Sequence, residues 1–514
     1  MADGKQQLHG PRYLIAAVGL SSIPRLITSV LTLVTFPLVL RAIGASEYGV
    51  FVYVTATLSV AIFLSDFGVT AASGKAIAEA RPSGLAATRR QLIRCVRLQA
   101  IIGSAGLIPV ALIAWTVIYT SKAVVVGPAF LFTMILATWL GVATAFARSC
   151  LQSYLAFGWL AVLDTVESLF RSAGWIVVAW FAPTNMALAV ATLITSVVTT
   201  LLGATILFSR SREKGIDAIE DDLSTVSNPY RRLIVDSVSF LGIGLATRVF
   251  ASAPYLIFGR LIGAEVVGVL GAFTRLLEMV SFPFTVLGNA LAVRAAEVKA
   301  AGLQAVVALW DACFRFVVVA AGAMGAFLLV SDVAARTLVP DSSSAPALFA
   351  ILSVVVLTNS TSYFIATMSD FVGAIKERVA FLAVLAIGQI PVLFAAAKLW
   401  HERGGITAYA AINIVMICGY IVIAKRAFFG TERYSLPPYI VQSFGVITVA
   451  LMGSLAAKVN ILSSTPSFLS LDFLVPLAAY IVLLCAAFAG LKRLRERFLT
   501  LAVFEFMGRS RSSF

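Results

Sequence analysis

Arg25 and Arg248 are two arginines in long apolar stretches, and neither has an acidic residue one helical turn away. The residues three and four positions from them are Ser21, Ser22, Thr28 and Ser29 for the first, and Gly244, Leu245, Ala251 and Ser252 for the second. A charged side chain near the bilayer centre costs on the order of 3 kcal/mol or more on insertion scales, so each one needs a partner or a purpose. A planar guanidinium donates paired hydrogen bonds to phosphate or carboxylate oxygens. The two residues therefore predict an anion site, with snorkelling of Arg25 towards the headgroups as the alternative.

Two further groups of opposite charge lie in other apolar stretches. Asp164, Glu167 and Arg171 are spaced at i, i+3 and i+7, which places them on one face of a helix. Arg275 and Glu278 are three residues apart. Each group either fastens the helices together as a neutralised ion pair or belongs to a binding site. Arg171 and Arg275 are candidate substrate-binding residues, as are Arg25 and Arg248.

Carboxylates in or near the apolar stretches are candidates for binding a coupling proton or sodium ion. They are Asp66, Asp164, Glu167, Asp236 and Glu278. Asp66 has a second interpretation, as a boundary residue among the lipid headgroups. We expect no metal or cofactor, because the five cysteines lack paired spacing, there are only two histidines, and no G-x-x-x-x-G-K-[ST] loop occurs.

The composition of the chain excludes a water-soluble enzyme. Of its 514 residues, 60% are apolar and 12% are charged, whereas soluble domains have about 25% charged residues. The apolar runs do not alternate with polar residues, which predicts helices rather than a membrane β-barrel. We therefore expect an all-α polytopic membrane protein. Its fourteen predicted spans lie at approximately 13–40, 48–68, 98–118, 124–147, 159–182, 185–208, 233–258, 263–290, 305–330, 344–367, 379–397, 404–424, 437–457 and 471–491.

Basic residues are distributed unequally between the two sides of the membrane. With the N-terminus inside, the predicted cytoplasmic segments hold 27 of the 39 Lys and Arg residues, the outer loops seven and the spans five. This bias follows the positive-inside rule and predicts that both termini are cytoplasmic. The longest cytoplasmic segments are 69–97 and 209–232. We expect the basic stretches to contact anionic lipid headgroups.

An internal repeat predicts the architecture. The segment RAIGASEYGVF at 41–51 recurs as RLIGAEVVGVL at 260–270, with six of eleven positions identical at an offset of 219 residues. Both copies join the first two spans of a half, and the halves run in the same direction. This predicts two six-helix lobes related by a pseudo-two-fold axis along the membrane normal, with a substrate site between them. Arg25 and Arg248 lie in the equivalent first spans, about one helical turn out of register.

The repeat and the spans together predict the organisation of the chain. We expect an N-lobe at 1–208, a cytoplasmic linker at 209–232, a C-lobe at 233–424, the last two spans within 425–491, and a basic cytoplasmic tail at 492–514. No segment is long enough to form a separate soluble domain.

A resemblance to a known family rests on two short motifs. The first is a Gly-x-x-x-Tyr-Gly outer turn, here Gly44, Tyr48 and Gly49, and the second is an Asp-x-Gly, here Asp66 and Gly68. Both lie in LRAIGASEYGVFVYVTATLSVAIFLSDFGVTAASGKAIAEA (40–80), which resembles the second-span region of Wzx-type polysaccharide flippases. These belong to the multidrug/oligosaccharidyl-lipid/polysaccharide (MOP) exporter superfamily. The stretch LIGAEVVGVLGAFTRLLEMVSFPF (261–284), which opens the second half, is similar to the same family.

The resemblance implies a MATE-like fold and a transport function rather than an enzymatic one. It implies that an undecaprenyl-diphosphate-linked oligosaccharide passes by alternating access from the cytoplasmic to the periplasmic leaflet of the bacterial inner membrane. The cargo would serve the synthesis of a cell-surface polysaccharide such as lipopolysaccharide or exopolysaccharide. The implied partners are this lipid, membrane lipids, a polysaccharide polymerase and chain-length proteins, without nucleic acid or cofactor.

Three alternatives remain open at this point. A cation-coupled multidrug exporter of the same superfamily should line its cavity with acidic residues. A major-facilitator transporter shares the parallel repeat, but the segment 66–80 lacks the G-x-x-x-D-R-x-G-R-R pattern expected there. A membrane glycosyltransferase or polymerase would need a large soluble domain or clusters of acids and histidines in its outer loops.

Overall fold

The computed structural model describes residues 24–119, 124–212, 229–281 and 320–429, apart from positions 25–26, 30, 33, 155, 321, 326, 329, 341 and 372–373. Arg25, the last two predicted spans and the basic tail lie outside the described residues. The described part of the chain is helical and contains no strand. Seven of its helical segments are long and apolar enough to cross a membrane. The predicted all-α membrane fold class is therefore confirmed.

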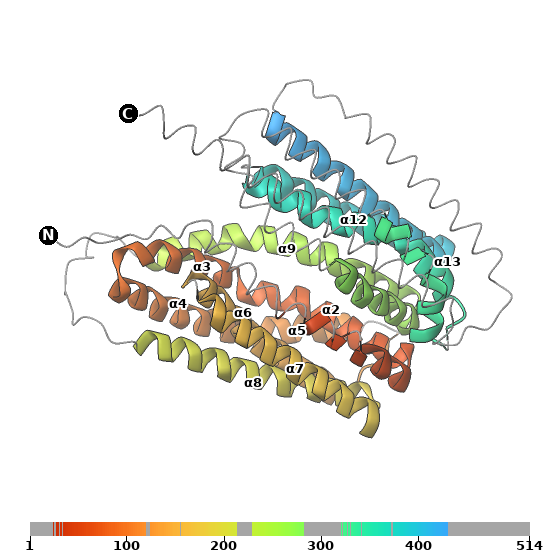
Figure 1. Ribbon diagram of the computed structural model, residues 1–514, viewed down its shortest axis with the longest axis horizontal. Helices are drawn as coiled ribbons and strands as arrows, with labels where there is room; N and C mark the ends of the chain where they lie inside the picture. The colour runs from red at the N-terminus through yellow and green to blue at the C-terminus, as the bar shows by residue number, and fades with distance from the viewer. Residues whose placement is uncertain are drawn as a thin grey trace, which may run out of the picture.

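The described helices are coloured in chain order, from red near the N-terminus to blue, in Figure 1. They are α2 (Ala45–Asp66), α3 (Val69–Ala80), the short 3-10 helix η1 (Arg81–Ser83), α4 (Leu85–Ala105), α5 (Leu107–Tyr119), α6 (Pro128–Ser153), α7 (Phe157–Phe181), α8 (Asn185–Arg212), α9 (Pro229–Leu261), α12 (Ala345–Phe371) and α13 (Ile375–Phe429). Further described helical residues lie before α2, at 264–281 and within 320–338.

The helix α9 lies between two groups of helices (Figure 1). On one side it packs against α2 and α3, which contact α4, α5 and α6, while α6 and α7 pack on α8. On the other side it packs against α13, which in turn packs against α12. The contacts along α2 and α9 run antiparallel, and they join Tyr53 with Gly259, Ser59 with Ser252, Phe63 with Gly244, and Gly68 with Ser237.

The long helix α13 is a pair of antiparallel helices. Its backbone leaves helical geometry at Trp400 and at His401, which has a φ of 52°. Phe381, nineteen residues before Trp400, packs on Gly419 and Tyr420 after it. The two halves therefore correspond to the predicted spans 379–397 and 404–424, and the turn falls in the predicted outer loop.

Residues 69–97, the predicted basic cytoplasmic segment, are helical and partly buried. This stretch forms α3, η1 and the first half of α4. Val69, Ala72 and Ile77 on α3 are buried, and the helix packs against α4, α6 and α9. The charged residues of α3 lie on one face, and its other face is buried against the neighbouring helices. A count of charges over the whole segment does not reveal this apolar face.

The sequence repeat marks the place where the two halves cross. Gly44 and Gly263 both take positive φ, 86° and 138°, and each directly precedes a helix. Five residues later, a Cβ at Gly49 would lie 1.8 Å from the carbonyl oxygen of Ala264, and a Cβ at Gly268 would lie 2.0 Å from that of Ala45. Gly49 and Gly268 are equivalent in the repeat, as are Ala45 and Ala264, so each glycine contacts the equivalent alanine of the other half. Such reciprocity is the property of a two-fold interface, and the small-x-x-x-small spacing lets two membrane helices approach closely.

We expect Gly49→Ala to lower the thermal stability of the purified protein by several degrees. The new methyl group meets backbone rather than a flexible side chain, so the two helices must separate, and overpacking of this kind costs roughly 1–3 kcal/mol. Gly242→Ala is the matched control, because a Cβ at that helical position meets nothing within 4 Å. Equal melting temperatures for the two variants in detergent would show that the crossing is not a tight contact.

Candidate functional site

A cavity of about 490 Å³ lies among the helices of the first half and is reached by α9 and the helix at 264–281. Four arginines line it, together with two carboxylates and nine hydroxyl-bearing side chains. The charged residues are Arg148, Arg171, Arg248, Arg275, Asp66 and Glu167, and the hydroxyl-bearing ones are Thr55, Ser59, Thr70, Thr138, Thr144, Thr192, Thr195, Ser196 and Thr199. Within an otherwise apolar bundle, this is where charged and hydroxyl groups converge, which makes it the candidate site.

Arg148 joins the predicted charged group on α7 to α6. Its Nε donates to Asp164 Oδ1 at 2.7 Å, and its Nη2 donates to Glu167 Oε2. Arg171 donates to the other oxygen of Glu167, as the sequence spacing predicts. The expectation that the three α7 residues neutralise one another was therefore incomplete, since Asp164 pairs with Arg148, which directly follows the predicted span 124–147. Its partners lie sixteen and nineteen residues away on another helix, so no local spacing could reveal the pair.

Arg275 and Glu278 form the predicted pair on the helix at 264–281. The distance between Arg275 Nη1 and Glu278 Oε2 is 2.9 Å. The guanidinium carbon also lies 5.9 Å from the ring centre of Trp175 on α7, which is a cation–π contact between the two halves. Arg275 faces the cavity, whereas Glu278 is not among the residues that line it.

Arg248 on α9 lines the cavity with no ion pair to any described residue. Its side chain is exposed, which is consistent with contact to the water or ligand that fills the cavity. Arg248 therefore lacks an acidic neighbour in the sequence and an acidic partner in space among the described residues. The equivalent Arg25 lies outside the described residues, so its predicted position beside Arg248 stays a prediction.

Asp66 ends α2 at a sharp turn. Phe67 and Gly68 both take left-handed backbone conformations, with φ of 51° and 75°, and a Cβ at Gly68 would lie 2.3 Å from the carbonyl oxygen of Ser237 on α9. Only glycine fits this close approach, which explains the Asp-x-Gly motif.

Asp66 is 7% exposed and lines the cavity, so it packs among the helices, and its position relative to the lipid headgroups stays a prediction. Its Oδ1 accepts hydrogen bonds from Thr70 Oγ1 at 2.6 Å and from Gln99 Nε2 at 3.1 Å. The buried Oε1 of Gln99 has no hydrogen-bond partner among the described residues. Unlike the acids on α7, Asp66 forms no ion pair with a described residue.

Asp236 does not belong to the cavity. Its Oδ2 lies 3.0 Å from Lys75 Nζ on α3, and neither residue lines the cavity. The pair links α3 to the first turns of α9, next to the Gly68 contact. Because an ion pair neutralises it, Asp236 becomes a weaker candidate for ion coupling than Asp66.

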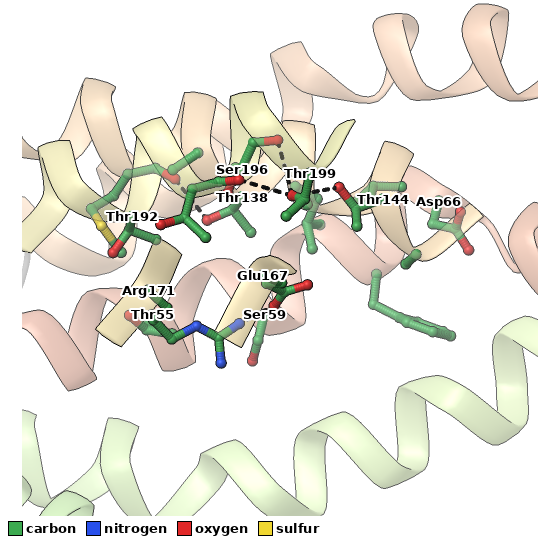
Figure 2. A pocket seen from close by; sticks show the side chains of 18 of the residues that line it. Thr55, Ser59, Asp66, Thr138, Thr144, Glu167, Arg171, Thr192, Ser196 and Thr199 are labelled. Atoms are coloured by element: carbon green, nitrogen blue, oxygen red, sulfur yellow. Dashed lines mark hydrogen bonds and ion pairs between the residues drawn. The ribbon is translucent and has the colours of Figure 1, made fainter. Parts of the chain in front are cut away.

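A row of hydroxyl groups on α6 and α8 was missed by sequence reasoning. This hydroxyl row consists of Thr138, Thr144, Thr192, Ser196 and Thr199, and Figure 2 shows it along one side of the cavity, with Arg171 and Glu167 on the other side in that view. The sequence did carry a signal, because the three α8 members are spaced at i, i+4 and i+7 and so share one helical face. Threonine and serine are common in membrane helices, which hides such a pattern.

The helical architecture is that of a multi-pass membrane protein, and its fold is similar to that of solved transporters of the MOP superfamily. A lipid II flippase, MurJ, in an inward closed conformation superposes with a TM-score of 0.64 and 12% identity, over 93% of this chain and 99% of its own. A multidrug resistance MATE family transporter of the MOP superfamily, in an inward-facing conformation, gives a TM-score of 0.56 and 16% identity, over 79% and 98%. At these identities the likeness shows a shared fold, as the resemblance predicted.

The chain belongs to the polysaccharide biosynthesis protein family, whose family model matches residues 14–292, more than half of the sequence. No curated protein sequence matches it significantly.

We expect Arg148→Met to destabilise the protein, because it leaves Asp164 without a cation between two apolar helices. Breaking a buried ion pair costs about 3–5 kcal/mol, and since these side chains are about one-third exposed the loss should be smaller. Asp164→Asn in the same chain should restore part of the melting temperature, because it removes the unpaired charge. Arg336→Met, which breaks an exposed pair with Asp332, is the control and should be nearly neutral. A double variant no more stable than Arg148→Met would argue against the pair.

Proposed function

We propose that this protein is a flippase that moves an undecaprenyl-diphosphate-linked oligosaccharide from the cytoplasmic to the periplasmic leaflet of a bacterial inner membrane. It would act by alternating access of its two halves, with both termini in the cytoplasm, and supply the synthesis of a cell-surface polysaccharide. The observation that carries the proposal is the cavity, where four guanidinium groups and nine hydroxyl groups gather within an apolar bundle. The family name and the fold of a lipid II flippase agree with such a cargo.

The arginines of the cavity suit a diphosphate. In the proposed complex Arg248 supplies a charge that no described carboxylate neutralises, and Arg25 would join it from the equivalent span. Arg171 and Arg275 are each paired with one carboxylate, and each guanidinium carries five N–H donors, so donors are left for the cargo. Charge-assisted, bidentate hydrogen bonds of this kind are the strongest that a protein makes to phosphate oxygens.

A cation-coupled multidrug exporter is the second candidate, because two carboxylates also line the cavity and a MATE transporter shares the fold. Glu167 is engaged by two arginines, which leaves Asp66 as the free carboxylate for a cationic drug. Three of the four arginines are ion-paired, and the remaining charge of Arg248 opposes a cationic cargo by like-charge repulsion. The anionic cargo is therefore the better supported of the two.

Asp66 is the strongest of the proposed ion-coupling residues. It is buried and lines the cavity, it has no cationic partner among the described residues, and it lies beside the unpartnered oxygen of Gln99. Asp164, Glu167, Asp236 and Glu278 are each held by an arginine or a lysine. A proton or sodium ion bound at Asp66 would change the charge of the cavity between the two halves of the transport cycle.

We expect Arg248→Ala to weaken binding of undecaprenyl diphosphate by roughly one to two orders of magnitude, because it removes a charge-assisted contact of about 1.5–3 kcal/mol. Arg248→Lys keeps the charge but loses the planar fork, so its affinity should be intermediate. Arg260→Ala, on the same helix but outside the cavity, is the control for binding. The melting temperature of Arg248→Ala should stay unchanged, and unchanged binding with a collapsed melting temperature would overturn the assignment.

We expect Asp66→Asn to abolish the dependence of transport on an imposed proton or sodium gradient in proteoliposomes, because the amide cannot exchange the ion. Asp236→Asn should retain that dependence, since its carboxylate is paired with Lys75 outside the cavity. A gradient effect that survives in Asp66→Asn would place the coupling elsewhere or make the protein a passive flippase.

A further inference from the structure

The hydroxyl row presents hydrogen-bond acceptors to the cavity. Thr138 Oγ1 donates its proton to the carbonyl oxygen of Met134 at 2.6 Å, and Thr192 Oγ1 donates to that of Leu188 at 2.7 Å. Thr199 donates in the same way to its own helix. A hydroxyl has one proton and two lone pairs, so a proton committed to the helix leaves acceptor capacity for a ligand.

The arginines present the opposite character. A guanidinium offers N–H donors and no acceptor, and Arg171 and Arg275 come from α7 and from the helix at 264–281, with Arg248 from α9. The hydroxyl row comes from α6 and α8 (Figure 2). Six of the nine hydroxyl groups of the cavity therefore lie on α6 and α8, and three of its four arginines lie on other helices. The fourth, Arg148 on α6, is engaged by Asp164 and Glu167.

An ionised diphosphate and a sugar also differ in whether they can donate hydrogen bonds. Diphosphate oxygens are acceptors only, so they gain nothing from a row of acceptors and are attracted to the arginines. Sugar hydroxyls carry protons that the threonine oxygens can accept. We propose that the hydroxyl row is the subsite for the sugar residue attached to the diphosphate, with the diphosphate held by the arginines. This inference rests on the proposed function and adds which helices contact the glycan.

The size of the cavity agrees with such a head group. At about 490 Å³ it falls within the range of about 300–1,000 Å³ typical of small-molecule pockets. A diphosphate with an attached sugar is a cargo of that class, and further sugars of a longer glycan would extend beyond the hydroxyl row. Within the described part of the chain, the half-buried threonines Thr138 and Thr192 form side-chain hydrogen bonds only to their own helices, so replacing them removes no hydrogen bond between described helices.

The test compares two lipids on one double variant, Thr138→Val with Thr192→Val. Valine keeps the shape of threonine and removes the hydroxyl. The probes are undecaprenyl diphosphate and the same lipid carrying a single hexose, bound to the full-length protein in detergent. The double variant should bind the glycosylated lipid about threefold to thirtyfold more weakly, as expected for one or two lost hydrogen bonds, and bind the bare lipid as the unaltered protein does.

Thr205→Val is the matched control, because Thr205 lies on α8, donates to its own helix at 2.8 Å and does not line the cavity. It should bind both lipids normally. Equal weakening of both lipids by the double variant, or no weakening of either, would overturn the sugar subsite while leaving the diphosphate site intact. If the unaltered protein binds neither lipid, the proposed function fails, and the subsite is overturned with it.

Discussion

The cost of placing charge between apolar helices determines how this protein is built. A guanidinium in the bilayer interior needs a carboxylate, water or a ligand, and the four arginines around the cavity meet that requirement in two ways. Arg148, Arg171 and Arg275 are held by carboxylates on α7 and on the helix at 264–281, while Arg248 faces the cavity without such a partner. The paired arginines link the helices around the site, and Arg248 and Asp66 line it without ion pairs to described residues.

The reciprocal glycine crossing fixes the position of the second half against the first. Gly49 on α2 packs on the backbone of the helix at 264–281, and Gly268 on that helix packs on the backbone of α2. The two helices therefore meet backbone to backbone. That close approach brings Arg275 against Trp175 on α7, and the antiparallel contact of α2 with α9 brings Arg248 to the same cavity. A site built from both halves can change when the halves move, which is what alternating access requires. The turn at Asp66 and Gly68, packed on Ser237, lies at the far end of the same contact.

The sequence predicted the fold class, the family and most of the described helices, because long apolar runs, short motifs and an internal repeat can be read directly from the order of residues. It also predicted the Arg275–Glu278 pair, since three residues along a helix is a fixed geometry. The sequence could not predict the ion pair between Arg148 and Asp164, because that contact depends on how α6 packs on α7. The burial of Asp66 and of α3 was missed for the same reason: both depend on packing against α9 and α4, and a hydropathy pattern does not contain this packing. The spacing of the hydroxyl row is visible in the sequence, but the sequence does not show which helices lie opposite the row across the cavity.

The central claim is that the cavity carries an anionic, lipid-linked cargo rather than a cation, and one transport measurement tests it most directly. The protein is reconstituted into vesicles that contain a fluorescently labelled undecaprenyl diphosphate with an attached hexose, and dithionite added outside bleaches the label in the outer leaflet. The account predicts that the protein makes the whole lipid pool accessible to dithionite, and that it does not move ethidium in parallel vesicles. Transport of ethidium, with the lipid label protected as in protein-free vesicles, would contradict it.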